Sequence, residues 1–157
     1  MRYAMKMFGL VSVLALSACG GDGESRDNGR FVGTWRATSG TVTTICPGYA
    51  PTTDPFAGTL TWSAGVSSDL VMTDLNGCVT QADVAGATAT GVPGQTCTTP
   101  DGAGGVYTVS LTGYTFVVSP DGHTATENSS GTLTYVGQGV SVVCSVNTTG
   151  AYQKIGN

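Results

Sequence analysis

Apolar residues alternate with threonine and serine along most of the chain after residue 30, without any useful length of helical periodicity. In GTLTWSAG, Leu60 and Trp62 fall on one face, whereas Thr59, Thr61 and Ser63 fall on the other. The same period of two recurs in VYTVSLTG, YTFVVSPDG, GTLTYVG and GVSVVCSVN. Because successive side chains of a β-strand point to opposite faces, this period indicates strands with one buried face. The sequence therefore predicts an all-β fold.

Turn residues cut this alternating pattern into short segments that follow one another closely. Short connections between sequential strands favour an antiparallel meander of about eight or nine strands. We expect the meander to form a closed or nearly closed barrel, because closure removes both exposed edges of a sheet. A β-sandwich is the alternative. The expected strands lie near residues 33–45, 57–64, 69–75, 78–84, 87–91, 106–112, 114–119, 131–137 and 139–147.

The Asn-Gly pair at 76–77 is the strongest hairpin signal, because both central residues of a type I′ turn need positive φ. It joins DLVMTDL to CVTQADV. A two-residue turn would place Val71 opposite Ala82 and Met72 opposite Gln81. Both faces of this hairpin would then be mixed in polarity. We therefore expect it to line a partly polar cavity or to be covered by a loop.

The first residues have the layout of a secretory signal. Arg2 and Lys6 precede an apolar segment from residue 7 to residue 18, which is too short and wrongly flanked for a membrane-spanning helix. Its last residues, Leu-Ser-Ala at 16–18, lead directly into Cys19. The following segment, GGDGESRDNGR, is rich in glycine and charge and is typical of a flexible tether.

The Leu-Ser-Ala-Cys stretch resembles the lipobox of bacterial lipoproteins. The resemblance implies cleavage before Cys19, lipidation of that cysteine with diacylglycerol, and acylation of the new amino terminus by a chain such as palmitate. It implies a signal peptide at 1–18, a tether at 19–30 and a single β-barrel-like domain at 31–157. Gly20 stands where an aspartate would favour the inner membrane, so the family analogy favours an outer-membrane location.

Four cysteines remain when Cys19 is set aside, and an even number in an exported chain favours two disulfides. Four cysteines allow three pairings. We favour Cys78 with Cys97, because turn residues between them fold one segment back on the other. Cys46 with Cys144 would then join the first strand to the last, as barrel closure requires. No CxxC pair is present and the chain has one histidine, which argues against a zinc site.

Composition and motifs point away from nucleic-acid binding and from catalysis. The formal net charge is −4, whereas phosphate binding needs clustered lysine and arginine. His123 follows a Pro-Asp-Gly turn, where a histidine is expected to be exposed. Asp69, Asp74 and Asp83 are not set opposite one another by the expected hairpin register, so no carboxylate pair suits glycoside hydrolysis. We expect no catalytic residue, no metal and no cofactor.

Gly33, Thr34 and Trp35 resemble the GxW motif of lipocalins. In that family the tryptophan closes one end of an eight-stranded barrel beneath a basic side chain near the last strand, and the resemblance makes Lys154 the candidate partner. The stretch from Cys78 to Cys97 also resembles a pattern in small bacterial lipoproteins, a likeness that implies no activity.

Taken together, these features predict a membrane-anchored envelope lipoprotein that acts as a non-catalytic binding or structural module. A small apolar ligand is one expectation, with a lined apolar cavity of at least about 300 Å³; a filled interior would favour a scaffold or protein binder. An inhibitor or adhesin that binds proteins through loops 47–56 and 98–105 is the alternative, and a hydrolase ranks third. The expected lining residues, which plain core packing also explains, are Trp62, Tyr107, Phe116 and Tyr135.

Overall fold

The computed structural model describes residues 28–74 and 77–157, and these residues fold almost entirely into strands. The predicted signal, Cys19 and all but the last three residues of the predicted tether lie outside the described residues. One short 3-10 helix, η1 (Asn28–Arg30), precedes the strands. The strands are β1 (Gly33–Ile45), β2 (Thr52–Pro55), β3 (Thr59–Ala64), β4 (Leu70–Asp74), β5 (Val79–Ala85), β6 (Thr88–Gly91), β7 (Thr96–Pro100), β8 (Val106–Val118), β9 (Thr124–Gly137) and β10 (Val140–Gly156).

Eight of these strands form a closed antiparallel barrel. The order around it is β10-β9-β8-β6-β5-β4-β3-β1, and pairing of β1 with β10 closes the sheet. The predicted barrel is confirmed, and the sandwich alternative is wrong. Closure leaves none of these eight strands with an open edge within the barrel, where unpaired backbone groups would invite association with other chains.

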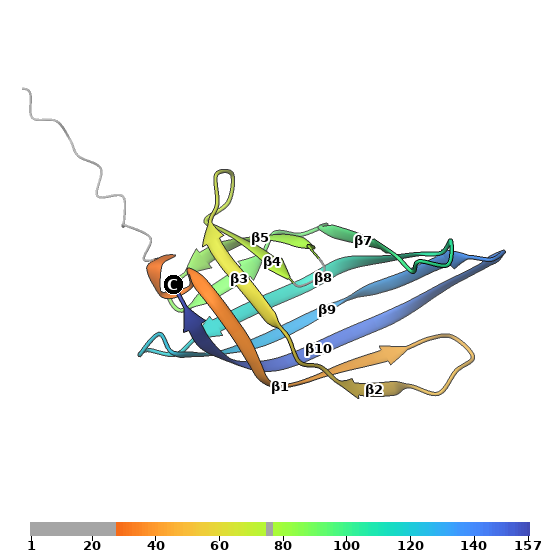
Figure 1. Ribbon diagram of the computed structural model, residues 1–157, viewed down its shortest axis with the longest axis horizontal. Coiled ribbons are helices and arrows are strands. Elements are labelled where there is room, and N and C mark those ends of the chain that lie inside the picture. The colour runs from red at the N-terminus through yellow and green to blue at the C-terminus, as the bar shows by residue number, and fades with distance from the viewer. Residues whose placement is uncertain (1–27, 75–76) are drawn as a thin grey trace, which may run out of the picture.

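Half of the barrel wall continues well beyond the barrel itself. Figure 1 shows β8, β9 and β10 running along the length of the molecule, with β7 and β2 at the end far from η1. β7 pairs with β8, and β2 pairs with β1. The outer parts of β1, β8, β9 and β10 together with these two strands are called the extension, and its inner face continues the barrel interior. β2 and β7 lie in segments for which the sequence predicts loops.

A β-bulge allows β8 to be one strand where the sequence predicts two. Tyr107, Val109 and Leu111 have odd numbers, whereas Tyr114 and Phe116 have even numbers, so a regular strand would point the two sets to opposite faces. The register of β8 against β9 shifts between residues 111 and 113. The extra residue shifts the alternation of side chains by one position. Tyr107, Val109 and Leu111 therefore face inward together with Tyr114 and Phe116.

The hairpin between β4 and β5 has a register one residue away from the predicted one. Leu70 pairs with Ala82, and Met72 pairs with Thr80. The backbone N–H of Gly77 donates to the Asp74 carbonyl at 3.1 Å, and φ of Gly77 is +76°. These contacts fit a three-residue loop that ends in a left-handed residue, rather than a two-residue turn. The observed register puts Leu70, Met72 and Ala82 on the buried face together with the buried Thr80, so this face is mixed in polarity, although the register is not the predicted one.

Aromatic side chains fill the end of the barrel that η1 covers, which is called the base. Phe31, Trp35, Trp62 and Phe116 are each at most 1% exposed. The ring centroids of Trp35 and Phe116 lie 5.3 Å apart in an edge-to-face arrangement. Burial of each large apolar side chain contributes about 1.5–3 kcal/mol, so this cluster is the main packing element of the barrel.

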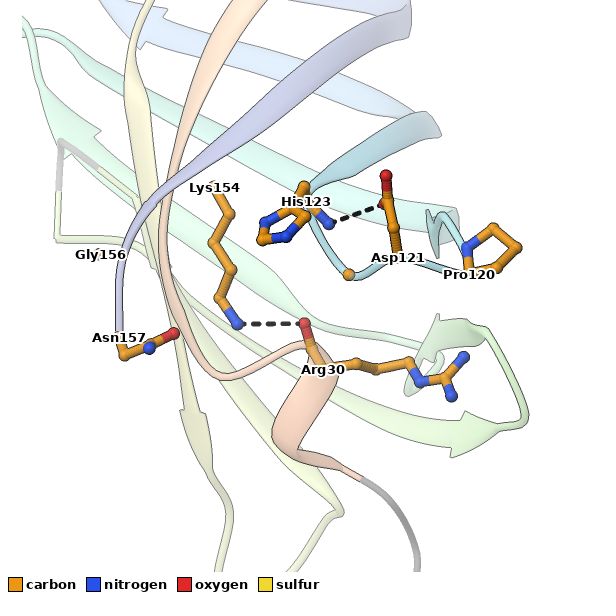
Figure 2. A pocket seen from close by; sticks show the side chains of 8 residues that line it. Arg30, Pro120, Asp121, His123, Lys154, Gly156 and Asn157 are labelled. Carbon is orange, nitrogen blue, oxygen red and sulfur yellow. Dashed lines mark hydrogen bonds between the residues drawn. The ribbon is translucent and has the colours of Figure 1, made fainter.

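Lys154 and η1 cover Trp35 at the base. The Trp35 indole N–H donates to the Phe31 carbonyl at 2.8 Å, and the Lys154 Nζ lies 5.5 Å from the centre of the Trp35 ring. The Lys154 Nζ also donates to the Arg30 carbonyl at 3.3 Å (Figure 2). The Lys154 side chain therefore lies over the Trp35 ring at this end of the barrel. Asn28 and Arg30, placed by the sequence in the flexible tether, are part of this cover.

Two disulfides join distant parts of the fold, with the pairings that the sequence favours. Cys46 pairs with Cys144 across the β1–β10 seam, with a sequence separation of 98. Cys78 pairs with Cys97, with a sequence separation of 19, and joins the β4–β5 hairpin to the start of β7. No helix in the described part of the chain is long and apolar enough to span a bilayer.

Candidate functional site

A cavity of about 200 Å³ lies at the end of the barrel opposite the base, where the barrel meets the extension. This end is called the mouth. The cavity is smaller than the 300 Å³ or more expected for a carrier of a drug-sized molecule. Its lining residues are Met72, Asp74, Cys78, Val79, Thr80, Gln95, Thr96, Cys97, Thr99, Tyr107, Val109, Leu111, Tyr114, Glu127 and Ser129.

Glu127 is the buried acidic group of this cavity. It lies on β9, where it pairs with Phe116 of β8 and Gly150 of β10, and it is only 8% exposed. The Tyr152 hydroxyl donates to its Oε2. Burial raises the pKa of the Glu127 carboxyl, because desolvation penalises the charged form, and the hydrogen bond from Tyr152 opposes part of that effect.

Tyr114 places a second polar group in the cavity without a partner in the protein. Its side chain is 4% exposed, and its hydroxyl makes no hydrogen bond with any described residue. Tyr114 pairs with Ser129 on β9, two residues from Glu127, so the two side chains are diagonal neighbours on one face. Burial, followed by the charge of Glu127, raises the pKa of Tyr114 well above its ordinary value. The hydroxyl therefore stays protonated.

All charged residues in the cavity lining are acidic. Asp74 and Glu127 line it, and no lysine, arginine or histidine does. The Asp74 Oδ1 accepts the backbone N–H of Cys78 at 2.9 Å. In the described ranges, no cationic side chain forms an ion pair with Glu127. The lining therefore presents the Glu127 carboxyl group with no cationic side chain beside it among the described residues.

The rest of the wall combines apolar residues with threonine, serine and glutamine, and the Gln95 side chain holds part of it in place. Gln95 receives the backbone N–H of Gln81 on its Oε1, and its Nε2 donates to the carbonyls of Gln81 at 2.8 Å and Val92 at 2.7 Å. These contacts fix the segment before β7 against β5. The Cys78–Cys97 disulfide fixes the same wall a few residues farther on. The Cys78–Cys97 disulfide and the three hydrogen bonds of the Gln95 side chain therefore hold the wall at the mouth.

The four aromatic residues expected to line a cavity occupy different environments. Trp62 and Phe116 belong to the packed cluster near the base, with ring centroids 5.6 Å apart. Tyr107 lines the cavity, and its ring centroid is 4.8 Å from that of Tyr135. The Tyr135 hydroxyl donates to Asp101 at 3.0 Å. The extension therefore supplies a pair of tyrosine rings beside the cavity.

His123 lies at the base, far along the barrel from this cavity. Figure 2 shows its ring beside Lys154, while the Arg30 side chain extends in another direction. The Asp121 Oδ1 accepts the backbone N–H of His123 at 3.0 Å and the hydroxyl of Ser119. Hydrogen bonds to Ser119 and to this backbone N–H lower the pKa of Asp121. The groups form a turn motif in which the histidine contributes its backbone N–H.

Sequence reasoning missed Glu127 and Tyr114 as cavity residues, and Tyr152 as the hydrogen-bond donor to Glu127. The sequence did contain a signal for Glu127. Glu127 has an odd number, as Leu133 and Tyr135 have, so a strand extended backward from 131 would have placed it on the inner face. The run Asn-Ser-Ser-Gly at 128–131 hid this continuity because it is typical of a turn.

The comparisons with protein-family models, with curated proteins and with solved structures give no match to this chain. Within residues 28–74 and 77–157, no three histidine, cysteine, aspartate or glutamate side chains gather as a metal-binding group. The cavity at the mouth is therefore interpreted from its own residues alone.

Proposed function

We propose that this protein is a non-catalytic binding module of the cell envelope that takes a small apolar ligand at the mouth of its barrel. The observation that carries the proposal is the buried Tyr114 hydroxyl, which faces the cavity and has no hydrogen-bond partner among the described residues. A buried polar group without a hydrogen bond costs about 1–3 kcal/mol, and a bound ligand that supplies the bond recovers that cost.

The size of the cavity limits the ligand. Pockets for drug-sized molecules measure about 300–1,000 Å³, so a cavity of about 200 Å³ suits a smaller molecule or one end of a longer one. Beyond the cavity, the inner face of the extension carries half-buried apolar residues on which the rest of a longer ligand can lie. These are Leu133, Val142 and Val146.

Native mass spectrometry of protein purified from its own host, with the lipid removed, tests this proposal. We expect an added mass of a small molecule on the wild-type chain. Val109→Trp fills the cavity from β8 and should abolish that mass, whereas Val117→Trp, at an exposed position on the same strand, should retain it. The proposal fails if no small molecule copurifies, or if Val109→Trp retains it with unchanged occupancy.

The envelope location rests on the proposed lipid anchor at Cys19. Its support is the apolar segment at 7–18 and the Leu-Ser-Ala-Cys stretch. Two or three acyl chains hold a domain stably on a bilayer, whereas one chain holds it only marginally. Mass spectrometry of the mature amino-terminal peptide should find a diacylglyceryl-modified Cys19 in the outer-membrane fraction. A mature protein that still carries residues 1–18 would refute the proposed anchor.

A protein-binding role is the second candidate, and the edges of the extension favour it. β2 pairs only with β1, β7 pairs only with β8, and every residue of β2 is exposed. An extended peptide can add to such an edge as a further strand. Copurification of a stoichiometric protein in place of a small molecule, in the same mass-spectrometry experiment, would favour this role.

A further inference from the structure

The charges at the bottom of the mouth cavity narrow the chemistry of its ligand. Glu127 and Tyr114 are deeply buried polar residues there, as is Thr80, and Asp74 adds a second carboxyl group nearer the rim. A buried carboxylate is costly unless a cation or several hydrogen bonds compensate it. Among residues 28–74 and 77–157, Glu127 has the single hydrogen bond from Tyr152.

Building on the proposed binding function, we propose that the ligand carries a protonated amine on an apolar body, and that its ammonium group binds between Glu127 and Tyr114. An ammonium group has three donors and no acceptor. One N–H donates to the Glu127 carboxylate in a charge-assisted hydrogen bond, and another donates to the Tyr114 hydroxyl oxygen. The apolar body then contacts the aliphatic wall and the Tyr107 ring.

The same geometry disfavours the other classes of small amphiphile. A carboxylate ligand would bring a third acid group beside Asp74 and Glu127, and like charges in one site repel. An alcohol can satisfy Tyr114, but it leaves the Glu127 charge without a counter-ion. Of the three ligand classes, only the amine both forms a hydrogen bond with the Tyr114 hydroxyl and carries a charge opposite to that of Glu127.

Affinity for the amine should fall as the pH is lowered through the Glu127 titration. The titratable groups that face Glu127 are Tyr114 from β8 and Tyr152 from β10, and their pKa values are raised, so both remain neutral. Asp74 on β4 is the other acid in the lining. Protonation of the carboxyl groups therefore removes the attraction for the ammonium, while a neutral ligand is little affected.

Calorimetric titration of the full mature protein in lipid nanodiscs, with empty nanodiscs as the blank, tests this inference. The probes share one aromatic body: 2-phenylethylamine, 2-phenylethanol and 3-phenylpropanoate. We expect the amine to bind roughly tenfold or more tightly than the alcohol, as a charge-assisted hydrogen bond implies. The carboxylate should not bind detectably.

Glu127→Gln is the matched variant, because it keeps the shape and the acceptor for Tyr152 but removes the charge. It should lower amine affinity to about that of the alcohol, and a cooperative denaturant unfolding transition shows separately that the variant is folded. Equal binding of amine and alcohol by the wild-type protein would overturn the amine inference and leave the proposed function standing. So would a preference for the amine that persists in Glu127→Gln. Binding of none of the probes would overturn both proposals.

Discussion

At the scale of single residues, Glu127 links stability to pH. Its pKa is raised in the folded protein because burial disfavours the charged form. Below the ordinary glutamate pKa both the folded and unfolded states hold the proton, so the group has no effect. As the pH rises from there through the folded-state pKa, the unfolded chain releases its proton first, and the folded state loses stability.

We therefore expect Glu127→Gln to be more stable than the wild type at pH 8 when no ligand is bound. The difference should shrink toward zero as the pH is lowered below the ordinary glutamate pKa. Chemical denaturation at a series of pH values measures both free energies of unfolding. A variant that is less stable than the wild type at pH 8 would show that the ionised Glu127 is compensated in the unliganded protein.

Two tyrosines beside Glu127 should respond in opposite ways to loss of the hydroxyl. Tyr152 donates to Glu127, so Tyr152→Phe removes a hydrogen bond to an acidic group and should cost about 1.5–3 kcal/mol. Tyr114 has no partner in the protein, so Tyr114→Phe should leave the stability unchanged or raise it. Thermal or denaturant unfolding of the two variants compares them directly. A large loss in Tyr114→Phe would mean that this hydroxyl already has a partner.

Part of the candidate site follows from sequence patterns and part does not. Tyr107 and the Cys78–Cys97 bridge could be predicted, because alternation and cysteine spacing are local signals. The meeting of Glu127 with Tyr114 and Tyr152 depends on the pairing of β8, β9 and β10 over their full length. A local pattern does not contain this pairing, because it is fixed by which apolar faces pack together.

At the scale of elements, the bulge in β8 keeps two apolar sets on one face. Deletion of Thr112 removes the extra residue and leaves a regular strand that keeps every other β8–β9 pair, so Tyr107, Val109 and Leu111 stay on the inner face. We therefore expect this deletion to cost no more stability than deletion of the exposed Ala50 between β1 and β2. Urea denaturation of the two deletion variants compares their stabilities. A much larger loss on deletion of Thr112 would show that the bulge does more than set the phase of the strand.

The existence and approximate bounds of most strands were predictable, whereas the ends and registers were not. β1 was predicted at its observed bounds, because its turn signals stand close to both ends. β9 begins at Thr124 and β10 ends at Gly156, beyond the predicted limits, since polar and glycine residues there hide the alternation. The β4–β5 register depended on burying Leu70 with Ala82, which outweighs the preference of an Asn-Gly pair for a two-residue turn.

At the scale of the whole molecule, the two disulfides should contribute unequally. In the chain-entropy model, a closed loop of about 100 residues contributes about 4.7 kcal/mol, and one of about 15 residues contributes about 3 kcal/mol. We therefore expect the Cys46→Ser, Cys144→Ser double variant to lose more stability than the Cys78→Ser, Cys97→Ser double variant. Guanidinium unfolding of both proteins measures the difference. The reverse order would show that the wall at the mouth depends on its bridge for more than chain entropy.

The opposite placement of base and mouth determines how a ligand reaches the cavity. Asn28, where the described chain begins, contacts Asp69 at the base, whereas the cavity opens beyond Asp74 at the other end of β4. On the proposal that Cys19 carries a lipid anchor, the tether joins the domain at the base, and the cavity opens at the opposite end. A ligand then has to enter the cavity at the end of the domain that is farther from the attachment point.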